Sequence, residues 1–150
     1  MNTPTGIDTT APVIARHQLL VQAPADAVWT LLTDVASWPS WQPDITTADL
    51  GAPLEPGATF HWSTAGLDIA STVYDLRAPH RILWGGPAHG ITGVHQWTLT
   101  PTGDGATLVA TEESWSGEPV LTATESVQQS LDRSLVQWLA HLKTAAEKPA

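Results

Sequence analysis

The sequence predicts an α+β protein, in which a curved antiparallel sheet of about seven strands wraps around a long C-terminal helix and two short helices follow the first strand. Two observations carry this prediction. Apolar and polar residues alternate over several stretches that are separated by Gly and Pro, and near the end of the chain apolar residues recur every three or four positions. An amphipathic helix and a one-sided sheet bury their apolar faces against each other.

The composition excludes several classes of function. Hydrophobic residues make up 42% of the 150 residues and charged residues 14%, which is typical of one folded domain. The 15 acidic side chains against 6 basic ones give a net charge of −9, so neither a nucleic acid nor an anionic membrane surface is an expected partner. The absence of Cys excludes disulfides and Cys nucleophiles. No apolar run approaches the ~20 residues of a membrane span.

The two ends of the chain lack periodic patterns. Residues 1–12 are rich in Thr, Pro and Gly, which predicts a flexible N-terminal arm, and residues 148–150 are expected to form a frayed tail. Residues 13–147 therefore form the single predicted domain. The arm lacks the basic start and apolar centre of a signal peptide, so we expect a cytoplasmic protein, and a homodimer is compatible with the sequence.

The first predicted elements are a strand and two short helices. Alternating residues predict a strand over residues 13–23. Pro24 suits the first turn of a helix, and apolar residues at helical spacing predict that helix over residues 24–33. The prolines within residues 34–43 allow at most one further turn of helix.

Six more strands and one helix complete the predicted fold. Gly and Pro punctuate the chain after residue 43, which predicts an antiparallel meander. Its strands are expected over residues 44–50, 57–65, 67–77, 80–86, 91–100 and 106–116. From Pro119 onward the spacing of apolar residues predicts one long amphipathic helix. Its apolar stripe contains Val120, Thr124, Val127, Leu131, Leu135, Trp138 and Leu142.

A sheet that bends around a helix leaves space between the two, and this space is either packed core or an apolar cavity. Eight of the ten aromatic residues are Trp, which is more than a core of this size usually needs, and this excess favours a cavity for a small molecule. The aromatic residues with inward parity on the strands either line this cavity or fill the core. They are Phe60, Trp62, Trp84, Trp97 and Trp115.

The long helix and the first strand supply the remaining candidate ligand-binding residues. Val127, Leu131 and Leu135 share the apolar stripe of the helix, so we expect them to face the cavity. His17 lies on the same face of its strand as Leu19, and from there it could reach the cavity.

A hairpin before the long helix supplies the candidate catalytic residues. If residues 103–105 form a three-residue loop, the register pairs Trp97 with Thr111 and His95 with Glu113. Such neighbours have Cβ atoms about 4.5–5.5 Å apart, so His95 and Glu113 could touch. A carboxylate beside an imidazole favours the imidazolium and orients the ring, which suits a general acid and base. The alternative is a buried polar pair that fixes the register.

The sequence contains no pattern for the other common chemistries. The histidines have no spacing that would gather three metal ligands, so no metal site is expected. No Ser lies in a Gly-x-Ser-x-Gly elbow. The Gly-rich loops lack the following helix that a phosphate or dinucleotide site needs, so we expect no cofactor.

Several motifs together resemble one known family. They are Ala23-Pro24-Ala25-Asp26-Ala27-Val28-Trp29, Leu32-Thr33-Asp34, Trp38-Pro39-Ser40-Trp41-x-Pro43, Pro56-Gly57-x-x-Phe60-x-Trp62, Ala78-Pro79-His80-Arg81-Ile82-Leu83-Trp84, Gly93-x-His95-x-Trp97, Glu113-x-Trp115-Ser116-Gly117 and Trp138-Leu139-x-x-Leu142-Lys143-x-x-x-Glu147. In order and spacing they resemble the bacterial polyketide cyclase/dehydrase and lipid-transport family of the START-like (SRPBCC) superfamily. The resemblance spans residues 13–147 and implies a helix-grip fold with a hydrophobic pocket between sheet and helix.

We expect a domain that binds a hydrophobic, polyketide-like or polycyclic small molecule. The leading hypothesis is a cofactor-independent cyclase or dehydratase, in which the cavity folds the substrate while His95 and Glu113 transfer a proton. The alternative is a non-catalytic carrier or sensor of a lipid-like hydrophobic ligand. A third possibility is an interaction protein whose groove receives a segment of another protein.

Overall fold

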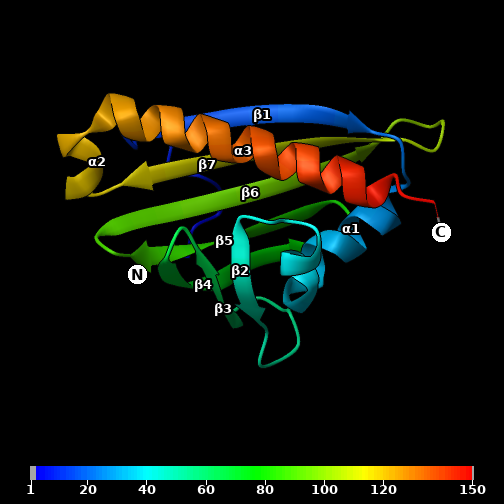
Figure 1. Ribbon diagram of the computed structural model, residues 1–150, viewed down its shortest axis with the longest axis horizontal. Helices are drawn as coiled ribbons and strands as arrows, with labels where there is room; N and C mark the ends of the chain where they lie inside the picture. The colour runs from blue at the N-terminus through cyan, green and yellow to red at the C-terminus, as the bar shows by residue number, and fades with distance from the viewer. Residues whose placement is uncertain (1–2, 150) are drawn as a thin grey trace.

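Seven antiparallel strands form one sheet in the computed structural model, which describes residues 3–149 (Figure 1). The strands are β1 (Val13–Val21), β2 (Ile45–Asp49), β3 (Thr59–Thr64), β4 (Leu67–Arg77), β5 (Arg81–Ala88), β6 (Ile91–Pro101) and β7 (Thr107–Ser116). Their order across the sheet is β1-β7-β6-β5-β4-β3-β2, so the first strand pairs with the last. The predicted meander and α+β fold class are confirmed, and the predicted strand ends differ from the observed ones by no more than two residues.

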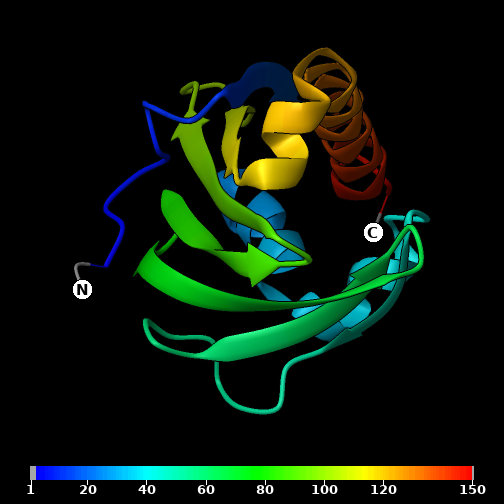
Figure 2. The same cartoon turned by 90° about the vertical axis from the view of Figure 1, so that its left-hand side faces the viewer.

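Two short helices and one long helix complete the fold. α1 (Ala25–Thr33) and the 3₁₀ helix η1 (Val35–Ser40) follow β1, so the two predicted short helices are present. The six residues of η1 make about two 3₁₀ turns with Pro39 inside, so the limit of one further turn is wrong. α3 (Thr124–Ala146) runs along the concave side of the sheet, and Figure 2 shows how the strands curve around the space beneath it. The curvature of the sheet leaves space for a site between the strands and α3, which a flat sheet would not leave.

The C-terminal helical region begins with a separate turn that the sequence did not predict. α2 (Glu118–Thr122) and α3 are separated by Ala123, whose φ of −147° and ψ of 43° lie outside the helical range. Val120 in α2 is completely buried, and the Thr124 hydroxyl donates to its carbonyl oxygen at 2.8 Å. One continuous helix from Pro119 is therefore wrong, because the chain turns at Ala123 and buries Val120 before α3 starts along the sheet.

Aromatic side chains fill the end of this space that η1 covers. The ring of Trp38 in η1 is central, with its centroid 5.4 Å from those of Phe60 and Trp138 and 5.5 Å from that of Trp84. Most of these contacts are edge-to-face, the geometry that aromatic pairs prefer. Packing of η1 against the sheet therefore closes one end of the space and leaves the other end for a cavity.

The described part of the N-terminal arm crosses the outer, convex face of the sheet. The backbone amide of Asp8 donates to Ser114 Oγ at 2.9 Å. Arg81 Nη2 donates to the carbonyl oxygen of Thr5 at 2.6 Å. These hydrogen bonds tie the arm to strands from both halves of the sheet. The first two residues of the expected arm and the last residue of the expected tail lie outside the described residues.

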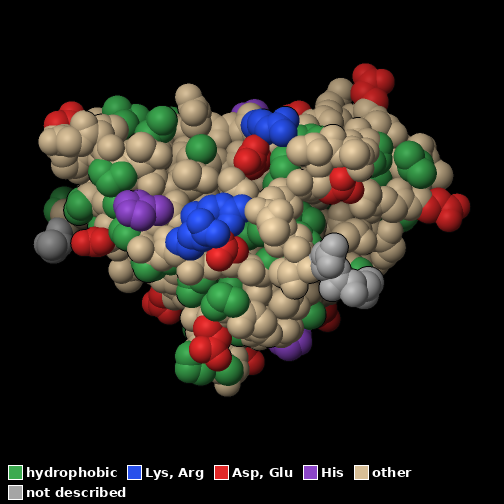
Figure 3. Space-filling view, turned by 180° about the vertical axis from the view of Figure 1, so that it is seen from behind, with side chains coloured by type: hydrophobic (Ala, Val, Ile, Leu, Met, Phe, Trp, Pro, Cys, Tyr) green, Lys and Arg blue, Asp and Glu red, His purple; other side chains and the backbone are tan. Residues whose placement is uncertain are grey.

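The outer face of the sheet is polar. Figure 3 shows Lys and Arg side chains on it that lie beside Asp and Glu side chains. Arg16 Nε, for example, lies 2.8 Å from Glu112 Oε2. Among residues 3–149 no helix is both long and apolar enough to cross a membrane.

Candidate functional site

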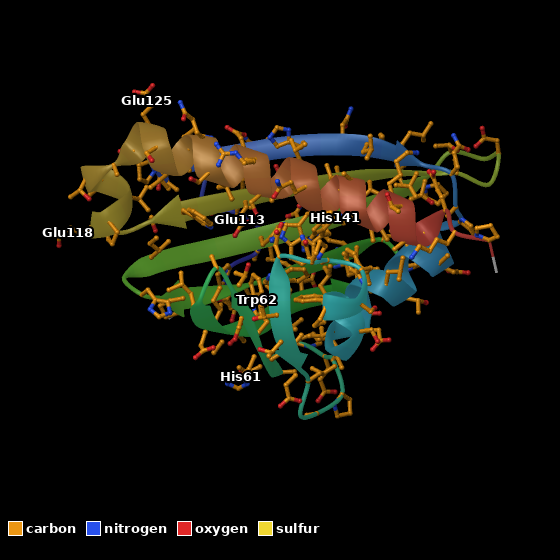
Figure 4. The ribbon with its side chains drawn as sticks, viewed as in Figure 1. His61, Trp62, Glu113, Glu118, Glu125 and His141 are labelled. Carbon is orange, nitrogen blue, oxygen red and sulfur yellow. The ribbon has the colours of Figure 1, made fainter. Side chains whose placement is uncertain are left out.

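A cavity of about 320 Å³ lies between α3 and the concave face of the sheet. Its walls come from β2 to β7, from the segment before β2, and from α3. Two predicted site residues on its wall, Trp62 of β3 and Glu113 of β7, are labelled in Figure 4, where His61 points away from the sheet. This volume is at the lower end of the roughly 300–1,000 Å³ that is usual for small-molecule sites.

Glycines on β5 and β6 create part of this space. A Cβ atom at Gly93 would lie 3.3 Å from Cδ1 of Trp115 and 3.7 Å from Oε2 of Glu113, so the missing side chain leaves the wall open beside both residues. A Cβ atom at Gly85 would lie 2.2 Å from the carbonyl oxygen of Gly93, so the two strands approach too closely there for any other residue.

The candidate catalytic residues lie side by side, as the sequence predicts. The β6–β7 register pairs His95 with Glu113 and Trp97 with Thr111, and it is confirmed. His95 Nδ1 lies 3.3 Å from Glu113 Oε1, and His95 Nε2 lies 2.7 Å from Thr111 Oγ1. Trp115 Nε1 donates to Glu113 Oε2 at 2.8 Å. These contacts fix the orientation of both the imidazole and the carboxyl group.

Burial keeps this pair uncharged over much of the acidic pH range. Desolvation lowers the pKa of His95 to about 3. It raises the pKa of Glu113 to about 7, against the opposing effect of the hydrogen bond from Trp115. The expectation that the carboxylate would favour an imidazolium is therefore wrong, because the loss of hydration outweighs the attraction between the two groups.

The hydrogen bond between His95 Nε2 and Thr111 Oγ1 can form with either neutral tautomer of the ring. In one tautomer the Thr111 hydroxyl donates to Nε2, and Nδ1–H faces Glu113 Oε1 at 3.3 Å. In the other tautomer Nε2–H donates to Thr111 Oγ1, and the unprotonated Nδ1 faces Glu113. The ring therefore keeps its bond to Thr111 without becoming charged.

Three of the five predicted aromatic residues line the cavity, namely Trp62, Trp84 and Trp115. Phe60 and Trp97 point inward but are fully buried in the core and are not part of the cavity wall. The expectation that they line it is wrong, because other rings lie around them. Phe60 packs on Trp84 at 5.7 Å, and Trp97 packs on the same ring at 6.5 Å.

The three predicted residues of the long helix also lie elsewhere. Leu131 and Leu135 are completely buried, Val127 packs against the core, and none of the three lines the cavity. Ser134 and Trp138 line it instead. They lie four positions apart on a neighbouring face of α3, since the stripe with Leu131 and Leu135 is occupied by packing against the sheet.

His17 lies away from the cavity as well. Its Nε2 is 2.8 Å from Oδ1 of Asp132 in α3, and it does not line the cavity. Its inward parity is as predicted, but β1 is directly beneath α3, so the ring meets the helix rather than open space. The pKa of Asp132 is lowered by hydrogen bonds from His17 and Gln128.

The sequence reasoning missed several residues of the cavity wall. Gln42, which is 1% exposed, and Ser71, which is 3% exposed, both line it, and so does His89 at the β5–β6 turn. Parity could have found Ser71, which follows Ile69 on the inner face of β4. Gln42 lies in an irregular segment, where no periodicity indicates direction.

No metal-binding arrangement is present in the part of the chain that the structure describes. No three His, Asp or Glu side chains gather there as ligands would. The polar side chains that line the cavity are the carboxyl groups of Asp44 and Glu113, the imidazoles of His89 and His95, and several amide or hydroxyl groups. Such a set can hold an oxygen-bearing hydrophobic molecule and exchange protons with it.

Comparison with protein families agrees with this architecture. A family model described as polyketide cyclase / dehydrase and lipid transport matches residues 13–147. The chain belongs to this family. Members of the polyketide cyclase/dehydrase and lipid-transport family bind hydrophobic small molecules, so the chain is a hydrophobic ligand-binding domain. A comparison with curated proteins gave no match.

Solved structures show the same START-like fold. A START superfamily protein from Mycobacterium smegmatis is 16% identical, with 89% of this chain and 97% of that chain covered at a TM-score of 0.78. The ZhuI aromatase/cyclase from Streptomyces sp. R1128 is 19% identical, with 89% and 93% covered at a TM-score of 0.75. The di-domain aromatase/cyclase BexL is 21% identical, with 95% of this chain and 53% of that chain covered at a TM-score of 0.72. At these identities the likeness concerns the fold.

Proposed function

We propose that this protein is a cofactor-independent cyclase or dehydratase that acts on a polyketide-like or polycyclic hydrophobic substrate. One observation carries the proposal: the Glu113 carboxyl group faces an apolar cavity with its pKa raised to about 7, and its Oε1 lies 3.3 Å from Nδ1 of the buried His95 ring. A carboxyl group that titrates near neutral pH can both accept and donate a proton during one reaction cycle. The aromatase/cyclase activity named for two of the similar structures supports the same class of reaction.

The reaction needs one proton to be taken up and one to be returned. Glu113 as a carboxylate accepts a proton from a carbon beside a substrate carbonyl group, and that carbon then attacks a second carbonyl carbon. The protonated Glu113 returns the proton to the oxygen of the new alkoxide, which becomes an alcohol. In a dehydration Glu113 then takes a second proton from the carbon next to the one that bears this hydroxyl group and delivers it to the hydroxyl group, which leaves as water while the carbon–carbon double bond forms. His95 lies beside the carboxyl group, with Nδ1 3.3 Å from Oε1, and its ring acts through Glu113 rather than on the substrate.

The cavity contributes by folding the substrate. Flat apolar walls are supplied by Trp62, Trp84 and Trp115, and they hold the two reacting carbons close together. The entropy cost of bringing these carbons together is then met on binding and does not add to the barrier of the reaction. The bound chain is shielded from water at the end that the aromatic cluster of Trp38 closes. No step of this scheme requires a group that the chain does not itself supply.

A carrier that leaves its ligand unchanged is the second candidate, and one observation favours it. His95 is 4% exposed, and both of its ring nitrogens already have protein partners in Glu113 and Thr111. A pair that is satisfied in this way could serve to hold the β6–β7 register and to present one oxygen atom to a lipid-like ligand.

Native mass spectrometry of protein purified from its own host distinguishes the two candidates. The experiment identifies any small molecule that remains bound, and the purified protein is then incubated with that compound. Conversion to a cyclised isomer, or to a product that lacks one water molecule, supports the enzyme. Recovery of the compound unchanged, with saturable binding, supports the carrier.

A further inference from the structure

Gln42 is a buried residue whose backbone amide, backbone carbonyl oxygen and side-chain oxygen all have hydrogen-bond partners. Its backbone N–H donates to the carbonyl oxygen of Trp38 at 2.8 Å, and its own carbonyl oxygen accepts from Ile45 N–H at 3.0 Å. Its side-chain Oε1 accepts from Asp44 N–H at 3.1 Å. A backbone N–H can only donate, so this contact fixes which end of the amide is oxygen and which is nitrogen.

The remaining atom, Nε2 of Gln42, has no hydrogen-bond acceptor among the described residues. The residue is 1% exposed, and it lines the cavity. Nε2 is not one of the fully enclosed polar atoms that lack a partner, which in residues 3–149 are Nε1 of Trp41 and of Trp97, so it keeps contact with open space. The free donor therefore lies where a bound molecule can accept from it.

Ser71 supplies a second donor on the cavity wall. Trp62 Nε1 donates to Ser71 Oγ at 3.0 Å, so this oxygen already acts as an acceptor. Ser71 is 3% exposed, it lines the cavity, and within residues 3–149 its hydroxyl hydrogen has no acceptor. The indole of Trp62 thus orients the Ser71 hydroxyl group, as the indole of Trp115 orients the Glu113 carboxyl group. The hydroxyl hydrogen of Ser71 is left to donate to a ligand.

We propose that Gln42 and Ser71 form a subsite that binds a ligand carbonyl oxygen, on the side of the cavity opposite Glu113. This proposal rests on the proposed function and adds that the cavity recognises a carbonyl group of the substrate. Ser71 on β4 and Glu113 on β7 are three strand spacings apart, roughly 14 Å along the curved sheet. One carbonyl group held at Gln42 and Ser71 places a second, more distant carbonyl group of the same molecule near Glu113.

The charges around the cavity exclude an anionic ligand at this subsite. Among the described residues that line the cavity there is no Lys or Arg, whereas Asp44 and Glu113 both line it. A carboxylate or phosphate would therefore meet acidic neighbours without a cation to compensate. Two neutral donors instead match a neutral acceptor oxygen, which is the group that repeats along a polyketide-like chain.

Two probes that differ only in a carbonyl group test this proposal. Fluorene and 9-fluorenone have the same ring skeleton, and isothermal titration calorimetry gives their affinities for the whole protein. We expect fluorenone to bind about tenfold more tightly than fluorene, since one or two hydrogen bonds to donors without partners distinguish them. The ratio should fall to about one in Gln42→Glu, which keeps the acceptor for Asp44 N–H and loses the NH₂ donor.

Gln42→Met provides a second variant, because a buried carboxyl group could unfold the first one. Ser71→Ala should lower the ratio partially, and Gln137→Glu on the exposed face of α3 is the matched control that should keep it. Equal affinities in the parent protein, or a ratio that persists in a folded Gln42→Met, overturn the subsite and leave the ligand-binding function standing. If neither probe binds the parent protein, both the subsite and the binding function are overturned.

Discussion

His95 Nδ1 lies 3.3 Å from Glu113 Oε1, at facing positions of β6 and β7. Burial disfavours the charged form of each residue, so it lowers the pKa of the imidazole and raises the pKa of the carboxyl group. Between the two pKa values, about 3 and about 7, both members of the pair are uncharged.

If the pair transfers protons, removal of either member should slow turnover. We expect His95→Ala and Glu113→Gln each to lower turnover by about 10²–10⁴-fold, which is the usual contribution of a positioned acid or base. The double variant should lose little more than either single variant, because the two residues act as a unit. Steady-state kinetics on the compound identified by mass spectrometry measures this. Full turnover in folded single variants would assign the pair to structure and favour the carrier.

The free energy of unfolding should depend on pH because of Glu113. Because its pKa is raised in the folded state from 4.5 to about 7, its contribution is fully present below pH 4.5 and is lost as the pH rises through 7. The stability of the parent relative to Glu113→Gln should therefore decline over this window by up to about 3 kcal/mol. Urea unfolding at several pH values tests the trend. A constant difference between the two proteins would show that Glu113 is not desolvated.

The contribution of His95 to stability should change with pH in the opposite direction. Its pKa is lowered in the folded state from 6.5 to about 3, so its contribution is present above pH 6.5 and is lost as the pH falls toward 3. Between pH 4.5 and 6.5 the two slopes oppose each other, and the parent protein should show little change in stability from this pair. The Glu113→Gln variant, which keeps only the slope of His95, should become more stable as the pH rises over the same interval.

The indole of Trp115 should hold the pKa of Glu113 down. Its Nε1 donates to Glu113 Oε2 at 2.8 Å, and this bond favours the ionised carboxylate. In Trp115→Phe we expect the pKa of Glu113 to rise above about 7, which carbon-13 NMR of the labelled carboxyl group can follow. Trp29→Phe, a change in α1 outside the cavity wall, is the control. An equal shift in both variants would mean that the hydrogen bond is not the cause.

A carboxylate in the middle of α3 should unfold the domain. Leu131 is completely buried against the sheet, so Leu131→Asp should cost several kcal/mol unless the new group takes up a proton. Val136→Asp on the same helix is a matched control, since Val136 is 51% exposed and should tolerate the change. Thermal unfolding compares the two. Similar melting temperatures would mean that the buried face of α3 is assigned wrongly.

A methyl group at Gly93 should narrow the cavity without unfolding the protein. Its Cβ would approach Trp115 to 3.3 Å, which requires only a small movement, whereas Gly51→Ala adds a methyl group with nothing within 4 Å. We expect Gly93→Ala to weaken the binding of polycyclic aromatic compounds several-fold while Gly51→Ala does not. Quenching of tryptophan fluorescence gives the affinities. Unchanged binding in Gly93→Ala would place the ligand away from β6.

The parts of this site that the sequence could predict are those fixed by local rules. Strand alternation placed His95 and Glu113 on the inner face, and the short glycine loop before Ala106 set the register that pairs them. Alternation could not show that Trp97 and Phe60 lie in the closed end of the space. That end is closed by Trp38 from η1, a long-range contact with no signal in the strands themselves.

The remaining errors concern direction around a helix or in an irregular segment. The stripe of Leu131 and Leu135 was found from its period, but the cavity is faced by Ser134 and Trp138, which only the position of the helix on the curved sheet decides. Ala123 is a good helix former and gave no sign that the helical region is interrupted there.

The pairing of β1 with β7 has a consequence for how the molecule is assembled. Val13 meets Trp115 about a hundred residues later, and closing such a loop costs roughly 4 kcal/mol of chain entropy. The hairpins from β3 to β7 need no such closure, so they can form while β1, although synthesised first, waits for its partner. α3 packs on β1, so it takes its final position when β1 joins the sheet. A ligand held beneath α3 binds only the protein in which β1 and α3 are in place, and it therefore favours the last step of folding.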